Sequence, residues 1–292
     1  MTKNPTSVAL GYFDGVHLGH AAVIRAAATR EYEPAVFTFK SRSPLPKLVA
    51  LSNSGGNNLN IISAGQKRKM LLNLGVKHIH SYEFHSIKGL SPEDFVLEIL
   101  IKALNAKVVS CGYDFHFGEG GKAGADDLSR ICKNHGLNTI VVPPVKIDGV
   151  TVSSTLIREF ISAGDIKTAN KFLGYPISYN LKVVGGNMLG RTIGFPTINQ
   201  NMPEDCVIPR LGVYKSCVFL KGKTFDGITN IGFKPTAGEY KKITAETHII
   251  NFNEDLYGRI IKFCLLDFIR EEKKFASFEE LKEQIHLDLK HL

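Results

Sequence analysis

The chain has 292 residues, more than one ordinary domain needs and enough for two. Hydrophobic residues make up 43% and charged residues 22%, a balance that supports packed cores and excludes general disorder. The net charge is +8, but the excess is spread along the chain and residues 67–69 form the only cationic triplet. This pattern is not typical of a nucleic-acid-binding arm, whereas a mild positive bias suits small anionic substrates such as nucleotides.

The five cysteines are odd in number and contain no C-x-x-C pair, which argues against a disulfide framework and a zinc knuckle. No run of 18 apolar residues occurs, so no membrane-spanning segment is predicted. The first ten residues lack the basic and apolar regions of a secretory leader. We therefore expect a reduced, cytoplasmic protein without a membrane partner.

Short β-rich runs alternate with stretches of helical spacing over the first 145 residues. Strands are expected at 7–12, 34–39, 78–84, 107–112 and 138–142, and helices at 18–30, 64–74, 92–105 and 124–134. This alternation predicts an α/β fold with a doubly wound parallel sheet. Such sheets bind ligands at the carboxyl ends of their strands, where the strand order switches. The polar, Gly-rich stretch 52–58 predicts a mobile loop, either a lid or a tolerated insertion.

Two short helices are expected next, at 155–163 and 166–173, and Gly174 and Pro176 end the helical texture. Later β-rich runs are separated by turns, at 179–185, 213–220, 224–231, 245–252 and 260–268. Their spacing predicts an antiparallel β-barrel. A last helix is expected at 277–289, with Ser277 as its cap and Glu280 three residues later. We place the domain boundary between residues 175 and 176, giving domains 1–175 and 176–292.

The segment 11–20, G-Y-F-D-G-V-H-L-G-H, follows the first predicted strand and opens a helix. Glycines such as Gly11 and Gly15 let the backbone approach a ligand, and a helix N-terminus suits phosphate. His17 and His20 are three apart and share a helix face, where two imidazoles could hold phosphate oxygens in a transition state. Alternatively, either histidine is a cap or a packed residue. A zinc site is disfavoured because no third ligand lies nearby.

The H-x-G-H spacing resembles the nucleotidyltransferase superfamily. The longer string is similar to the adenylyltransferase module of the bacterial bifunctional riboflavin kinase/FAD synthetase family. The resemblance implies catalytic roles for His17 and His20. It also implies that ATP is bound by four other residues of the segment: Gly11, Phe13, Asp14 and Gly15.

Two later segments agree with this resemblance. Residues 111–118, C-G-Y-D-F-H-F-G, are similar to the family's G-x-[ND]-F-x-F-G, which implies flavin binding by Asp114 and Phe115. Residues 152–158, V-S-S-T-L-I-R, match its I-S-S-T/S-x-I-R pattern. Taken alone, Ser-Ser-Thr is an ordinary helix cap, but beside segment 11–20 it predicts a second phosphate clamp. The residues of this clamp are Ser153, Ser154, Thr155 and the catalytic Arg158.

The segment 190–199, G-R-T-I-G-F-P-T-I-N, has the composition of a β-turn. Its other interpretation is a backbone cradle in which Thr197 and Asn199 are oxygen ligands of Mg²⁺. The string resembles the G-R-x-x-G-F-P-T-x-N signature of riboflavin kinase, which implies ATP binding by Gly190, Gly194 and Pro196.

Supporting segments follow in the family's order, among them E-T-H at 246–248 and D-L-Y-G at 255–258. The resemblance implies that Glu246 is the general base and that Tyr257 binds the flavin. Without the resemblance, Glu246 would be interpreted as a solvated strand residue.

The chain departs from the family after the second predicted strand. Family members read F-x-P-H-P after T-F, whereas residues 40–44 here read K-S-R-S-P. Arg42 either binds the phosphate of FMN or marks a changed flavin pocket.

The sequence thus predicts a bifunctional transferase that uses ATP and Mg²⁺. It would phosphorylate riboflavin to FMN and adenylylate FMN to FAD, releasing pyrophosphate. No nucleic-acid partner is expected, and no oligomeric state is predicted. Three alternatives stay open: a single active module with the adenylyltransferase inactive, a cytidylyl- or pantetheine-type transferase, and a flavin-binding regulator.

Overall fold

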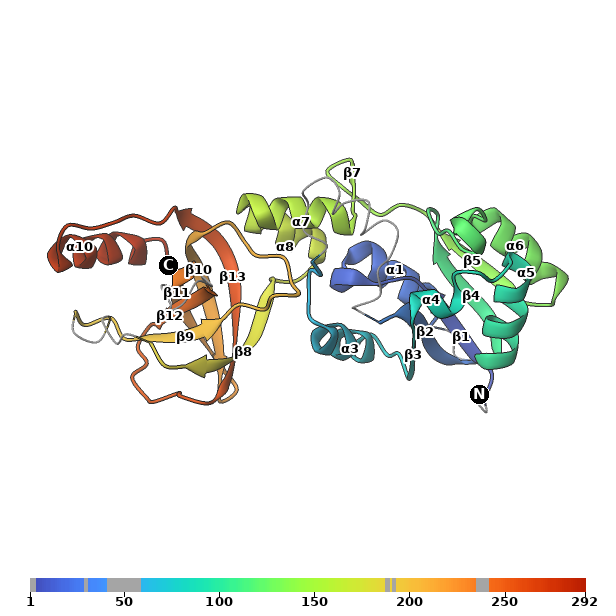
Figure 1. Cartoon of the computed structure of the whole chain (residues 1–292), viewed down its shortest axis with the longest axis horizontal. Helices are drawn as coiled ribbons and strands as arrows, with labels where there is room; N and C mark the ends of the chain where they lie inside the picture. The colour runs from blue at the N-terminus through green and yellow to red at the C-terminus, as the bar shows by residue number, and fades with distance from the viewer. Residues whose placement is uncertain (1–3, 29–30, 41–58, 187–189, 191–192, 235–241) are drawn as a thin grey trace. The chain divides into compact units, whose positions relative to one another are not determined.

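The computed structural model describes residues 4–28, 31–40, 59–186, 190, 193–234 and 242–292 (Figure 1). The chain divides into two compact units, Met1–Ser154 and Thr155–Leu292. The division falls after the first residue of helix α7 (Ser154–Ala163), so the rest of α7 and all of helix α8 (Ile166–Leu173) group with the second unit. The domain boundary predicted between residues 175 and 176 stays a prediction.

The first unit is built on a five-stranded parallel sheet in the order β3-β2-β1-β4-β5. Its strands are β1 (Thr6–Leu10), β2 (Glu33–Phe39), β3 (His78–Tyr82), β4 (Ala106–Gly112) and β5 (Asn138–Val142). The predicted doubly wound sheet is thus confirmed. Because the strand order reverses between β1 and β4, the ligand-binding edge of this fold lies at the carboxyl ends of these two strands.

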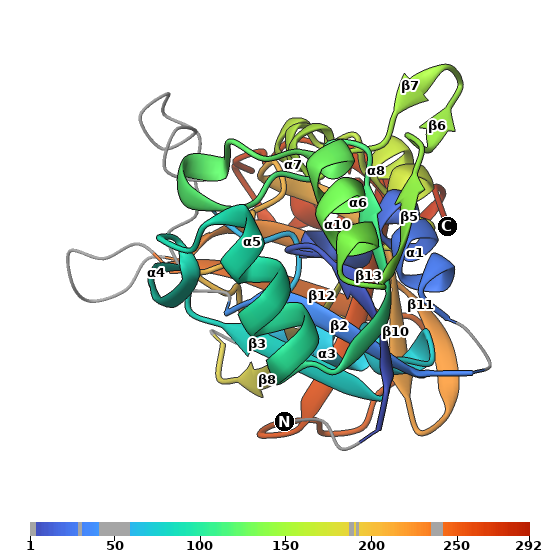
Figure 2. The ribbon, with the colours of Figure 1, turned by 90° about the vertical axis from the view of Figure 1, so that its right-hand side faces the viewer.

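Helices cover both faces of this sheet. In Figure 2, α5 and α6 lie in front of the strands and α1 lies behind them. The helices of this unit are η1 (Asp14–Val16), α1 (Leu18–Ala26), α3 (Ala64–Asn73), α4 (Phe84–Ile87), α5 (Pro92–Asp94), η2 (Phe95–Ala103), η3 (Glu119–Gly121) and α6 (Ala125–Asn134). A short hairpin, β6 (Lys146–Ile147) and β7 (Val150–Thr151), follows them. Fully buried Val8, Leu100 and Leu128 join the sheet to η2 and α6 in one core.

The helix predicted over 92–105 differs from the observed structure. One short α-helical turn, α5, continues into the π-helix η2, and the amide of Leu104 donates to the carbonyl of Ile99 five residues earlier. The helix predicted over 18–30 ends at Ala26. The spacing of apolar residues located both helices, but it does not distinguish an α-helix from a π-helix or fix the residue at which a helix ends.

The second unit is a closed six-stranded barrel in the order β10-β11-β12-β9-β8-β13, which confirms the antiparallel prediction. Its strands are β8 (Ser178–Val184), β9 (Thr197–Asn201), β10 (Gly212–Leu220), β11 (Lys223–Lys234), β12 (Lys242–Ile249) and β13 (Ile260–Arg270). Residues 197–199, predicted as part of a turn, belong to β9. This polar strand pairs with β8 and β12, and tertiary pairing thus overrides its weak β propensity.

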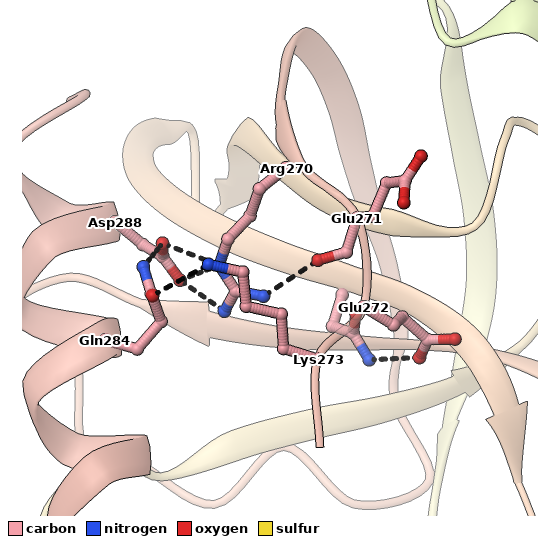
Figure 3. A network of polar contacts seen from close by, with 7 residues as sticks. Arg270, Glu271, Glu272, Lys273, Gln284 and Asp288 are labelled. Carbon is pink, nitrogen blue, oxygen red and sulfur yellow. Dashed lines mark hydrogen bonds and ion pairs between the residues drawn. The ribbon is translucent and has the colours of Figure 1, made fainter. Parts of the chain in front are cut away.

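Helix α10 (Phe278–Leu289) is fixed to the barrel by a buried ion pair (Figure 3). Arg270 at the end of β13 binds Asp288, which is 2% exposed, with an Nη2–Oδ2 distance of 2.7 Å. Gln284 Nε2 donates to Asp288 Oδ1 at 2.9 Å. The predicted cap is confirmed, because the Ser277 hydroxyl accepts from the amide of Glu280. Among the described residues, no helix is both long and apolar enough to cross a membrane.

Candidate functional site

The turn that follows β1, here called the motif turn (residues 11–17), has an unusual backbone. Phe13, Gly15 and Val16 have φ angles of +56°, +80° and +39°. A side chain at position 15 would also place its Cβ 2.9 Å from Cδ1 of Ile61, so only glycine fits there. Left-handed backbone at non-glycine residues costs free energy and persists where the surroundings hold it in place.

Two hydrogen bonds at Asp14 fix the middle of the motif turn. It is 2% exposed, and its Oδ1 accepts from the amide of Ile61 at 2.9 Å. Its backbone carbonyl accepts from the hydroxyl of Ser154 at 3.0 Å. The structure thus brings together Asp14 and Ser154, two residues predicted to bind ATP from segments far apart in sequence. Ser153, half-buried, precedes Ser154 in the same segment.

His17 and His20 lie in one stacked pair at the start of α1. Their ring centroids are 3.5 Å apart and the planes meet at 18°. His17 is the N-cap, and its Nδ1 accepts from the amide of His20 at 3.2 Å. An accepting Nδ1 carries no proton, so a neutral His17 has its proton on Nε2 and presents a donor there. Gly19 makes room for this ring, because a Cβ would lie 3.2 Å from His17 Cε1.

The interpretation of His17 as a helix cap is therefore correct, and it is compatible with a role of His17 in binding phosphate. The cap fixes the ring at a helix N-terminus, where peptide dipoles and amide groups favour negative charge. His20 is held from its other side by an edge contact with Phe13, at 5.4 Å between ring centroids. Both imidazoles are thus pre-oriented at an edge suited to phosphate.

The predicted flavin-binding residues Asp114 and Phe115 follow β4, at the same edge of the sheet as the motif turn. Asp114 is exposed and Phe115 is half-buried, with its ring stacked on Phe117 at 5.8 Å. Arg42 lies outside the described residues. Lys40, which precedes it, forms an ion pair with Glu83 at 2.9 Å.

Two predicted residues, Thr155 and Arg158, lie on α7 and belong to the second unit, within which Thr155 is exposed and Arg158 half-buried. In the first unit, sequence reasoning missed the polar residues around Tyr12. The Tyr12 hydroxyl donates to Asn60 Oδ1 at 2.8 Å, and Lys67 Nζ donates to the Tyr12 carbonyl at 2.9 Å.

In the barrel, strand register aligns the predicted metal ligands with the predicted base. Asn199 of β9 is directly opposite Glu246 of β12, which is directly opposite Asn230 of β11. Directly opposite residues point to the same face of a sheet, so these three side chains form one row. Thr197, two residues before Asn199, points to this face as well. Asn230 was not predicted as a site residue.

Asn199 has the character of a cation ligand. The side chain is 6% exposed, and its Oδ1 has no hydrogen-bond partner among the residues that the structure describes. A buried carbonyl oxygen without a partner is costly, and a hard cation that prefers oxygen satisfies it. Gly186 packs on this amide, since a Cβ there would lie 2.4 Å from Nδ2. The residues at this position therefore fit Mg²⁺.

The turn before β9, here called the signature turn and described at Gly190 and residues 193–196, is closed by its own backbone. The amide of Phe195 donates to the carbonyl of Gly190 at 2.8 Å. A Cβ at position 190 would lie 2.3 Å from the Phe195 carbonyl oxygen, and Gly194 has a φ of +88°. His248 Nδ1 donates to the carbonyl of Pro196 at 2.8 Å, a contact that sequence reasoning missed.

A cleft of about 450 Å³ opens beside the signature turn. Pro196, Thr197 and Tyr257, three residues predicted to bind ligand or metal, line it. The lining also includes residues 252–254, which were not predicted. One predicted ATP residue, one predicted metal ligand and the predicted flavin residue of the barrel thus line one hollow, whereas Asn199 and Glu246 are not among its lining residues.

Comparisons with known proteins match both units. The FAD synthetase family matches residues 1–156 and the riboflavin kinase family matches residues 173–292. A bifunctional riboflavin kinase/FMN adenylyltransferase from Listeria monocytogenes is 35% identical over 96% of this chain and 89% of its own length. The chain belongs to this bifunctional family. The Escherichia coli K12 relative of the same description is 32% identical, with the same coverage.

A solved structure also matches the chain over both units. It is 32% identical, has a TM-score of 0.87, and covers 99% of this chain and 94% of its own. That protein, from Streptococcus pneumoniae, is described as a macrolide-efflux protein. The two family matches leave residues 157–172 between them, which include most of α7 and α8.

Proposed function

We propose that the chain catalyses two successive reactions of flavin metabolism. The barrel transfers the γ-phosphoryl group of ATP to riboflavin and forms FMN. The parallel-sheet unit transfers the adenylyl group of a second ATP to FMN and forms FAD and pyrophosphate. The observation that carries this proposal is that the two family models match separate parts of the chain, residues 1–156 and 173–292, with an organised H-x-G-H turn in the first and a cleft lined by Pro196, Thr197 and Tyr257 in the second.

In the barrel reaction, Glu246 accepts the proton of the riboflavin 5′-hydroxyl. The hydroxyl oxygen forms a bond to the γ-phosphorus as the bond to the β-phosphate oxygen breaks and ADP leaves. The register row supports this role, because it sets the base beside Asn199 on the neighbouring strand. Thr197 and Asn199 would hold Mg²⁺, which when bound shares the phosphate oxygens and neutralises their charge.

In the adenylyl transfer, an oxygen of the FMN phosphate attacks the α-phosphorus of ATP and pyrophosphate leaves. Both reacting oxygens belong to phosphates, so the step needs positioning and charge stabilisation rather than a strong base. His17 and His20 donate to phosphate oxygens at the N-terminus of α1. The hydroxyls of Ser154 and Thr155 and the guanidinium of Arg158 form the predicted second clamp.

The substrates are accordingly the small molecules ATP, riboflavin and FMN. We also propose a cytoplasmic location, which the chemistry of the cysteines supports. All five are buried thiols, a state that a reducing compartment maintains.

One incubation tests both activities. The purified full-length chain is mixed with riboflavin, ATP and Mg²⁺, and riboflavin, FMN and FAD are separated by chromatography over time. We expect FMN to rise first and FAD to follow, and excess EDTA to stop both. If FMN forms but no FAD is detected, even when FMN is supplied as substrate, then only the barrel is active. Flavin binding without any ATP turnover would instead support a regulatory protein.

A further inference from the structure

Lys67 is the one buried lysine in the part of the chain that the structure describes. It lies on α3 and is 8% exposed, whereas its neighbours in the cationic triplet, Arg68 and Lys69, are exposed. Burying an ammonium group costs free energy unless the group is well partnered. In neither of the proposed reactions does this charge have a role.

The ammonium group of Lys67 lies against Tyr12, the residue immediately before the first left-handed residue of the motif turn, Phe13. Nζ donates to the carbonyl of Tyr12 at 2.9 Å and lies 4.4 Å from the centroid of the same residue's ring. It is also 3.4 Å from Thr38 Oγ1 and 3.5 Å from the carbonyl of Phe39. The Thr38 hydroxyl donates to the Tyr12 carbonyl as well, at 2.9 Å. One carbonyl at the start of the motif turn is thus held by two donors.

Charge gives Lys67 a second connection to the motif turn. The carboxyl group of Asp14, itself buried, attracts the ammonium and raises the pKa of Lys67. Burial has the larger, opposite effect, and the pKa falls from 10.5 to about 8. Lys67 therefore fixes the first part of the turn and compensates the charge of the residue that fixes its middle. Phe13, with its left-handed backbone, lies between these two points.

We propose that Lys67 is a positioning residue for the adenylyl transfer. Its charged amine clamps the Tyr12 carbonyl, balances Asp14, and so holds His17 and His20 in their stacked arrangement. The inference rests on the proposed function of the first unit, and it assigns Lys67 no contact with substrate.

The clamp has a consequence for pH dependence that an ordinary structural role lacks. Around the amine, the structure describes one charged group, Asp14, together with the Tyr12 ring, the Thr38 hydroxyl and the two carbonyls. When Lys67 loses its proton, the buried carboxylate of Asp14 loses the attraction of this ammonium, beneath a turn that must bind polyphosphate. We therefore expect the kcat for FAD formation to fall as the pH rises through about 8.

Stability changes in the opposite direction. The pKa of Lys67 is lower in the folded protein than in the unfolded chain, so unfolding binds a proton between pH 8 and 10.5. The contribution of Lys67 to stability therefore rises with pH in this window. A residue that only anchored α3 would not lower activity while its contribution to stability increased.

The experiment compares Lys67→Met, Lys67→Arg and the matched control Lys69→Met, which removes an exposed lysine from the same helix. FAD formation from FMN, ATP and Mg²⁺ is measured from pH 6.5 to 9.5. Riboflavin phosphorylation by the same chain is the internal control. Lys67→Met is expected to lower the kcat for FAD formation roughly tenfold to a hundredfold, the scale of a small misplacement of reacting groups, with each KM changed less than threefold.

Three further results are expected. Lys67→Arg, whose charge persists, should recover part of the kcat and lose the alkaline decline. Lys69→Met should behave like the unaltered protein. Hydrogen exchange at the amides of residues 11–20 should be faster in Lys67→Met and unchanged in Lys69→Met.

A kcat within twofold of the unaltered protein in Lys67→Met would overturn the inference. So would an unaltered protein whose kcat stays constant to pH 9.5, a measurement that needs no variant and decides the matter if Lys67→Met fails to fold. If the unaltered protein makes no FAD, the proposed function fails instead. Hydrogen exchange then still decides whether Lys67 holds the turn.

Discussion

The two units build their sites in different ways. In the first unit, the candidate groups lie on a turn with left-handed residues at 13, 15 and 16, held by buried charges and side-chain hydrogen bonds. In the barrel, the candidate groups Asn199 and Glu246 lie on neighbouring strands, and ladder register alone sets them side by side. The first site therefore depends on a few long-range side-chain contacts, whereas the second depends on backbone pairing that most single substitutions leave intact.

The largest expected effect tests whether the two sites are independent. Glu246→Gln keeps the shape of the side chain and removes its basicity, so riboflavin phosphorylation should fall by about 10²–10⁴, the usual range for a general base. FAD formation from supplied FMN should continue at the unaltered rate. Both rates are measured by chromatography of the flavins. Loss of both activities in a folded variant would contradict the picture of two separate sites.

His20→Ala is the corresponding test in the first unit. It removes one donor and also the ring that stacks on His17 at 3.5 Å. We expect FAD synthesis to fall by about 10²–10³, the usual scale for one transition-state donor, while FMN formation continues. His135→Ala, at an exposed position after α6, is the control. A nearly normal rate of FAD synthesis in His20→Ala would remove this histidine from the mechanism.

The same contrast explains what the sequence could predict. Both fold classes and the cap of α10 followed from local patterns, and the H-x-G-H string predicted where two histidines meet. Strand β9 was missed because most of its residues are polar and β12, with which all five of its residues pair, comes much later in the chain. Local composition indicated a turn at residues 197–199, and only closure of the barrel makes them a strand.

Lys67 shows a different limit. In the sequence it is one cation among three, and nothing about its charge separates it from Arg68 or Lys69. Its position four residues before Leu71, which is fully buried, was the available signal, because residues four apart share a helix face. Periodicity can thus place a lysine on the inner face of a helix. The carbonyl that it contacts, in a segment 55 residues away, could not be read from the sequence.

A substitution in one unit should change the stability of that unit alone. Asp288→Ala leaves the guanidinium of Arg270, only 15% exposed, without its carboxylate (Figure 3). Breaking a buried pair costs about 3 kcal/mol, so the second unit should unfold at lower urea while the first unit is unaffected. Glu98→Ala, which breaks an exposed pair with Lys102, should change stability by less than about 1 kcal/mol. Parallel losses in both units on urea unfolding would show that they unfold together.

The smallest expected effect concerns the signature turn, where the barrel site does depend on one side-chain contact. His248→Phe keeps a ring beside Phe195 and removes the donor to the Pro196 carbonyl. One hydrogen bond contributes about 1 kcal/mol, so the KM for ATP in riboflavin phosphorylation should rise roughly fivefold to tenfold with a smaller change in kcat. His286→Phe is the matched control, because His286 of α10 also contacts the Phe195 ring, at 5.2 Å. If both variants raise the KM equally, ring packing rather than the hydrogen bond positions Thr197. An unchanged KM in His248→Phe would mean that register alone suffices, and the contrast with the first unit would be complete.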